Sequence, residues 1–236
     1  MLQTPPIDAL LVAIIAFTPG LIWLWYFYRR DTCSKEPKAM VLRTFLFGMA
    51  STAPAAIVEM FFGNYLVTPF ILAVVIAPVV EETVKFSVVR FTVFDQKTFD
   101  QIIHGIMYGV AAALGFASVE NGIYVVRALG ISSTAAIGTF AFRALTSVPA
   151  HALISGTWGY ALGVAKLGNP KMRGIIIGSG LIIAFLLHGF FNLLAGDQML
   201  ISIVLLLVAY VPILWLFTNR NIESAVKACT IVLRRD

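Results

Sequence analysis

Seven long apolar stretches, separated by short charged segments, make up most of this 236-residue chain. They cover residues 8–28, 41–62, 68–91, 102–126, 135–165, 174–195 and 199–217. At about 1.5 Å per residue, a helix of about 20 residues crosses a hydrocarbon core of roughly 30 Å. Lipid offers no hydrogen-bond partner to an open strand edge, so such stretches must be helices. The sequence therefore predicts an all-α, polytopic transmembrane helix bundle of about seven helices, forming one domain over residues 1–236.

Charged residues are scarce and unevenly placed. They make up 12% of the chain, against 59% hydrophobic residues, whereas soluble domains average about 25%. If the spans alternate, fourteen of the seventeen Lys and Arg residues lie on one side of the membrane, Arg127 lies on the other, and Lys85 and Arg143 lie within spans. Basic loops stay in the cytoplasm. We therefore expect a multi-pass protein of a prokaryotic cell membrane, with its N-terminus outside and its C-terminus cytoplasmic. The net charge of +5 then needs no nucleic-acid partner.

Polar and ionisable side chains occur inside the predicted spans. They are Glu81, Glu82, Lys85, Glu120, Asn121, Arg143, Ser147, His151, His188 and Asn192. A charge at a helix centre costs roughly 2.5–3.5 kcal/mol, so the five charged members would together cost on the order of 12–17 kcal/mol if each faced lipid. That exceeds a typical folding free energy of about 5–15 kcal/mol. We expect these side chains to face one another around a wetted cavity, which marks a functional site. Glu59, by contrast, lies close to the outer interface and is expected to be solvated.

Spacing predicts some of the contacts within and between helices. Residues four apart share a helix face, which pairs Glu81 with Lys85 and places His188 beside Asn192. Small residues in the fourth span allow close helix contact; they are Gly105, Gly109, Ala113 and Gly115.

Two prolines lie just upstream of polar groups, Pro78 before Glu81 and Pro149 before His151. Proline has no N–H to donate, so each should free the carbonyl four residues earlier. The carbonyls of Val74 and Leu145 are therefore expected to be open to water or to a substrate strand.

The polar residues form four ordered motifs. They read Glu81-Glu82-x-x-Lys85, Gly115-Phe116-Ala117-x-x-Glu120-Asn121-x-x-Tyr124, Arg143 with Pro149-x-His151, and His188-Gly189-x-x-Asn192. This set resembles the PrsW family of intramembrane proteases, distant relatives of the CAAX prenyl proteases and the bacteriocin-immunity membrane proteins. The likeness covers the motif-bearing core, about residues 68–195. One departure is His104, where the family usually has an acidic residue, and it leaves the role of that position open.

The resemblance implies an intramembrane endopeptidase. Its substrate would be a membrane-tethered protein, such as a single-pass anti-sigma factor. The residues implied as catalytic are Glu81, Glu82, Glu120, His151 and His188. The residues implied as supporting are Lys85, Asn121, Arg143 and Asn192.

The residues leave the metal dependence open. Peptide hydrolysis needs a base for the attacking water, donors for the oxyanion and an acid for the leaving amine. Two histidines and one glutamate form a common catalytic zinc set. Here that set would be His151 and His188 with either Glu81 or Glu120, although no HExxH helix is present. Catalysis by carboxylates alone is the alternative.

Two other functions could use the same polar cavity. A polytopic transporter also places ionisable groups at mid-membrane, although no internal repeat is evident here. A non-catalytic membrane sensor would keep the cavity without the chemistry. A cleavage assay separates both from a protease.

Overall fold

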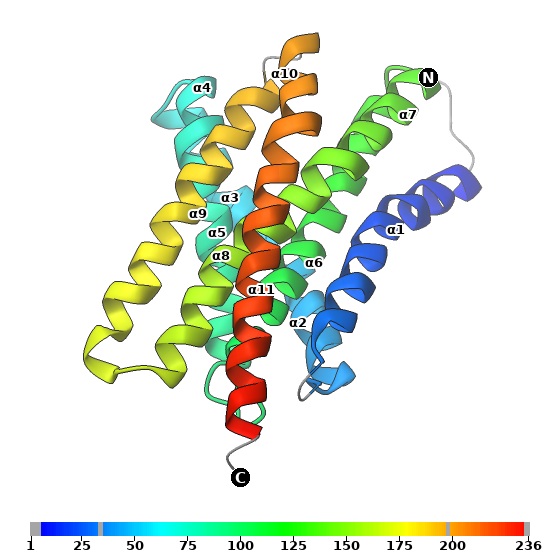
Figure 1. Ribbon diagram of the computed structural model, residues 1–236. Helices are drawn as coiled ribbons and strands as arrows, with labels where there is room; N and C mark the ends of the chain where they lie inside the picture. The colour runs from blue at the N-terminus through cyan, green and yellow to red at the C-terminus, as the bar shows by residue number, and fades with distance from the viewer. Residues whose placement is uncertain (1–5, 33–34, 197–198, 234–236) are drawn as a thin grey trace.

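The computed structural model describes the whole chain except residues 1–5, 33–34, 197–198 and 234–236. Within this part, all regular structure is helical and forms seven continuous segments (Figure 1). They are α1 (Pro6–Arg30); α2 (Lys38–Ala50) with α3 (Thr52–Tyr65); α4 (Pro69–Ile71), η1 (Leu72–Ile76) and α5 (Ala77–Thr92); α6 (Ile102–Leu129); α7 (Ser133–Phe142), η2 (Arg143–Ser147) and α8 (Val148–Leu167); η3 (Pro170–Met172) with α9 (Arg173–Gly196); and α10 (Leu200–Leu205), η4 (Leu206–Tyr210) and α11 (Val211–Leu233). The predicted all-α bundle is confirmed.

Five of the segments are long and apolar enough to cross a membrane. They are Lys38–Tyr65, Ile102–Leu129, Ser133–Leu167, Pro170–Gly196 and Leu200–Cys229. The remaining two predicted spans coincide with α1 and with the α4–α5 segment. Many large apolar side chains are exposed on the outside of the bundle, as expected of helices that face lipid. The chain is therefore a multi-pass membrane protein.

The last helix is longer than predicted. The apolar stretch ends at residue 217, but α11 continues to Leu233. The extension is amphipathic, because Ile222 and Ala225 are buried against the core while Glu223 is exposed. Apolar length alone could not show this continuation.

Helix α6 lies at the centre of the bundle and is packed through its small residues. A Cβ at Gly105 would lie 2.2 Å from the carbonyl oxygen of Gly159, and one at Gly115 would lie 2.0 Å from that of Phe45. The predicted close contact of α6 with its neighbours is thus confirmed, against α8 on one side and α2 on the other. α5 contacts α6, α8 and α9, and α8 contacts α6 and α9. The helices that carry the polar motifs therefore surround a shared interior.

Three π-helical turns (η1, η2 and η4) each end two residues before a proline: Pro78, Pro149 and Pro212. In η1 the N–H of Ala77 reaches the carbonyl of Leu72, five residues earlier. With this spacing, the carbonyl that Pro78 leaves without a helical donor is that of Ala73, one residue before the predicted Val74. Asn192 of α9 donates to it, at 2.9 Å. The π turn therefore moves the unpaired carbonyl by one residue, and a side chain of the neighbouring helix α9 hydrogen-bonds to it.

Candidate active site

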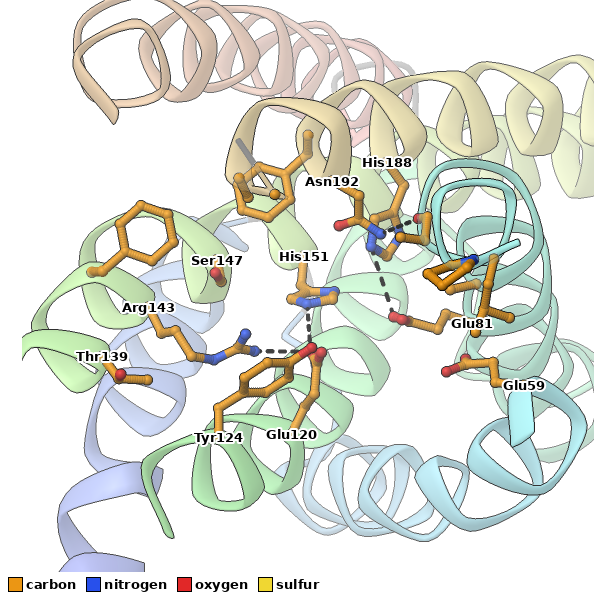
Figure 2. Close-up of a pocket in the computed structure, with 18 of the residues that line it drawn as sticks. Glu59, Glu81, Glu120, Tyr124, Thr139, Arg143, Ser147, His151, His188 and Asn192 are labelled. Carbon is orange, nitrogen blue, oxygen red and sulfur yellow. Dashed lines mark hydrogen bonds and ion pairs between the residues drawn. The ribbon is translucent and has the colours of Figure 1, made fainter. Parts of the chain in front are cut away.

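A partly open cavity of about 700 Å³ lies among the motif-bearing helices. Four of the residues implied as catalytic line it: Glu81, Glu120, His151 and His188 (Figure 2). Its wall also includes residues of α4, α7 and α10, such as Pro69, Thr139 and Ile203. Figure 1 places these three helices at one end of the bundle. The cavity therefore extends from the polar cluster toward that end.

Glu82 lies beneath the cavity and is fully buried. Its Oε1 accepts from Lys85 Nζ at 2.9 Å and from His188 Nδ1 at 3.0 Å. Its Oε2 accepts from Ser155 Oγ at 2.6 Å and from Trp158 Nε1 at 2.9 Å. An ionised carboxylate offers about four lone-pair sites, so these four donors use its whole capacity. These hydrogen bonds fix the Glu82 side chain, and Glu82 in turn orients the side chains that donate to it.

Lys85 neutralises the carboxylates of Glu81 and Glu82. Its ammonium lies 3.0 Å from Glu81 Oε2, which confirms the predicted ion pair, and 2.9 Å from Glu82 Oε1. A third contact reaches His151 Nδ1 at 3.1 Å. The ammonium also lies over the Phe116 ring, 4.2 Å from its centroid. Because Lys85 is fully buried, these contacts replace its hydration, as a buried charge requires.

The partners of the two histidines indicate their tautomers. An ammonium has only donors, so Nδ1 of His151 must accept from Lys85. Nε2 then carries the proton and donates to Glu120 Oε2, at 3.0 Å. His188 has the opposite tautomer, with the proton on Nδ1, because Nδ1 donates to the acceptor-only carboxylate of Glu82. The Nε2 lone pair of His188 therefore faces Glu81, whose Oε2 is 3.8 Å away.

Glu81, His151 and His188 bring one ligand atom each within 4.8 Å of one another, and they are the one such group in the described ranges. The other ring nitrogen of each histidine donates to a carboxylate outside the group, Glu120 or Glu82. Metal-binding histidines are commonly held in this way. The ammonium of Lys85 contacts two of these ligand atoms, at 3.1 Å from His151 Nδ1 and 3.0 Å from Glu81 Oε2, so a metal bound here would take its place. These residues therefore fit a divalent metal, and of the two glutamates left open by the sequence, Glu81 is the one placed to bind it.

Glu120 belongs to a neighbouring group at the cavity wall. Its Oε2 lies 2.9 Å from Arg143 Nη2 and 3.0 Å from His151 Nε2. The guanidinium stacks on the Tyr124 ring, 4.1 Å from its centroid. Nε and Nη2 of Arg143 are buried and make no hydrogen bond of good geometry within the described part of the protein. The guanidinium of Arg143 can therefore still donate hydrogen bonds to a molecule in the cavity.

The two implied supporting asparagines lie in different places. Asn121 is buried away from the cavity, where its Nδ2 donates to the carbonyl of Ala16 at 2.8 Å and ties α6 to α1. Asn192 lines the cavity beside His188.

One further residue of the cavity is not among the implied site residues. Glu59 of α3 is half-buried and lines the cavity next to Glu81 (Figure 2). It was expected to be solvated at the outer interface; α3 turns this side chain toward the cavity, while its neighbours Val58 and Met60 are exposed on the outside. The direction of a side chain on a uniformly apolar helix leaves no trace in the sequence.

His104 lies far from the cavity. It is sixteen residues from Glu120 along α6, which corresponds to about 24 Å. Its Nδ1 is 2.9 Å from Glu36 Oε1, and its Nε2 is 3.7 Å from Asp31 Oδ2. All three side chains are buried. Burial raises the pKa of the Asp31 carboxyl, and the charge of His104 opposes the shift. The departure from the family pattern thus concerns the other end of the bundle.

A membrane-embedded helical bundle that gathers two histidines and a glutamate around a cavity has the architecture of an intramembrane metalloprotease. Comparison with known proteins agrees, since the model of the PrsW family intramembrane metalloprotease matches residues 36–217. The chain is 35% identical over 211 residues to Protease PrsW of Geobacillus kaustophilus, covering 88% of both chains. It is 30% identical to Protease PrsW of Bacillus subtilis, covering 88% of this chain and 92% of the relative.

A third relative, Protease PrsW of Clostridioides difficile, is 31% identical over 92% of this chain and 91% of its own. The chain therefore belongs to the PrsW family of intramembrane metalloproteases, which confirms the resemblance noted from the motifs. It is a membrane protease, and its substrates are membrane proteins. No solved structure matches it.

Proposed function

We propose that the protein is a divalent-metal-dependent endopeptidase of the cell membrane, with zinc as the metal, that cleaves single-pass membrane proteins such as an anti-sigma factor. The observation that carries this proposal is the convergence of Glu81, His151 and His188 on one cavity wall, with ligand atoms within 4.8 Å of one another. We also infer that residues 1–236 act as one protease domain, with its motif-bearing core at about 68–195.

The three cavity residues would hold the metal, and two buried carboxylates would hold the histidines. A metal bound there supplies a Lewis acid for the scissile carbonyl and activates the attacking water. Glu82 and Glu120 fix the ring orientations by accepting the other ring N–H groups. Such outer partners are needed because they set the tautomer that leaves a lone pair for the metal.

Glu120 is the residue best placed to move protons. Its contacts with Arg143 and His151 both use Oε2, so Oε1 can face a water in the cavity. We assign to Glu120 the acceptance of a proton from the attacking water and its return to the leaving amine. Donors of Arg143 on the same wall would stabilise the developing oxyanion.

The direction of access follows from the predicted topology. With the N-terminus outside, the end of the bundle that holds α4, α7 and α10 faces outward. The cavity extends to this end, so we infer that the protease cuts its substrate near the outer face of the membrane.

The test is a cleavage assay in proteoliposomes with a panel of single-pass membrane substrates. Wild-type protein should release a defined product, a chelator should abolish cleavage, and metal add-back should restore it. Glu81→Gln and His188→Ala should be folded and inactive, whereas the exposed control Glu223→Gln should remain active. Ion flux without any cleavage would instead favour a transporter, and binding without cleavage would favour a sensor.

A further inference from the structure

Glu59 is the carboxylate of the cavity for which the proposed mechanism has no role. It reaches the cavity from α3, which packs against η1 and α5, and Figure 2 shows it beside Glu81. Its Oε1 is buried and has no hydrogen-bond partner within the described ranges. An ionisable group placed in this way inside a membrane protein is expensive to keep, which by default marks a function.

The cations of the cavity are already engaged by other carboxylates. Lys85 lies at 3.0 Å or less from Glu81 and Glu82, and Arg143 at 2.9 Å from Glu120. No ion pair of Glu59 is found in the part of the chain that the structure describes. A cationic partner for the ionised Glu59 carboxylate would therefore come from a bound molecule.

Geometry argues against a metal-ligand role for Glu59. The ligand atoms that lie within 4.8 Å of one another belong to Glu81, His151 and His188, so Glu59 stands outside this group. It nevertheless lies next to Glu81 on the wall of the same cavity, which also includes the apolar side chains of Leu72 and Ala77. A long cationic side chain could lay its aliphatic stem along such a surface and direct its charge to the carboxylate.

We propose that Glu59 forms a specificity subsite that binds a Lys or Arg side chain of the substrate next to the scissile bond. This inference rests on the proposed function, because it names a substrate feature read by the same cavity. A half-buried carboxylate left unpaired by a neutral or acidic substrate discriminates against that substrate. Hydrogen bonds to charged groups contribute about 1.5–3 kcal/mol, which corresponds to a preference of about 10- to 150-fold.

The experiment compares substrates that carry Lys, Gln or Glu at each position flanking the cleaved bond, once the cleavage site has been mapped by mass spectrometry. Wild-type protein should prefer Lys over Glu by at least about tenfold in kcat/KM. Glu59→Gln should lose this preference, and Glu59→Lys should reverse it. Glu59→Gln should cleave the Gln substrate at least as fast as wild type, because no unpaired carboxylate remains, and Glu59→Lys should cleave the Glu substrate; both results also show that the variants fold.

Two results would overturn the proposal. One is the absence of any charge preference in wild-type protein at every flanking position. The other is an equal fall in kcat on all substrates in Glu59→Gln, which would place Glu59 in the proton-transfer machinery.

A binding measurement separates this inference from the proposed function. In a Glu81→Gln background, peptides with Lys should bind at least about tenfold more tightly than peptides with Glu, and Glu59→Gln should remove the difference. If wild-type protein cleaves nothing but this charge preference in binding persists, the protease proposal fails while the subsite stands. Equal binding of both peptides would reject the subsite.

Discussion

Replacing Glu82 by Gln should damage the fold, whereas the same change at Glu81 should damage only the chemistry. Glu82 receives four buried donors, two of them from Ser155 and Trp158. A glutamine keeps one accepting oxygen and turns an NH₂ group toward the other two donors, so the Trp158 N–H loses its acceptor. An unsatisfied buried donor costs about 1–3 kcal/mol, and weakening two charge-assisted bonds removes on the order of 2 kcal/mol more. The expected loss is about 3–5 kcal/mol, as for other broken buried ion pairs.

Glu81 is the matched control. Its side chain lines the cavity, where water can replace a lost contact, and a glutamine oxygen there can still accept from Lys85. Glu81→Gln should therefore lose about 1 kcal/mol or less. Unfolding in detergent micelles by denaturant measures both values, and a cleavage assay should find both variants inactive. Equal stability losses, or a larger loss for Glu81→Gln, would refute the assignment of Glu82 as the structural partner.

Three further predictions address the packing, the opened helix and the loop after α1. Gly115→Ala should destabilise the protein by about 1–3 kcal/mol or more in the same unfolding assay, because the added Cβ would lie 2.0 Å from the carbonyl oxygen of Phe45. Gly138→Ala is the control: its Cβ meets no atom within 4 Å, so its stability should be unchanged. Asn192→Leu should cost about 0.5–1.5 kcal/mol, because it removes the hydrogen bond to a carbonyl freed by proline while cavity water can replace the donor; unchanged stability would contradict this. Burial raises the pKa of Asp31 above its ordinary value of 3.8, so the folded state binds more protons than the unfolded state and stability falls as the pH rises through that window. Asp31→Asn should therefore gain in melting temperature relative to wild type between pH 4 and pH 7, and an identical difference at both pH values would contradict this.

The spans and the nearest contacts could be predicted because they follow from simple physical limits. Bilayer thickness fixes the length of a crossing helix, and the helical repeat places Glu81 on the face of Lys85. The cost of isolated charges in lipid predicts that the motifs converge. The structure does bring Glu81, Glu120, His151 and His188 to one cavity, and their catalytic roles remain proposals.

Other features depend on the packing of helices, which the sequence does not reveal. Ser155 and Trp158 hold Glu82, yet neither residue type is unusual in a membrane span. Asn121 shares a motif with Glu120 but turns toward α1, since adjacent residues on a helix point about 100° apart. The inward direction of Glu59 likewise depends on how α3 is rotated against η1 and α5. Only the three-dimensional arrangement separates residues that meet the substrate from those that hold the bundle together.

Metal content measured on purified protein tests the central claim most directly. Inductively coupled plasma mass spectrometry of the wild-type protein should find about one divalent metal per chain, as expected for three protein ligands and one open position. His188→Ala and Glu81→Gln should lose that metal, whereas Glu223→Gln should keep it. Metal-free wild-type protein that still cleaves its substrate in the presence of a chelator would contradict the account.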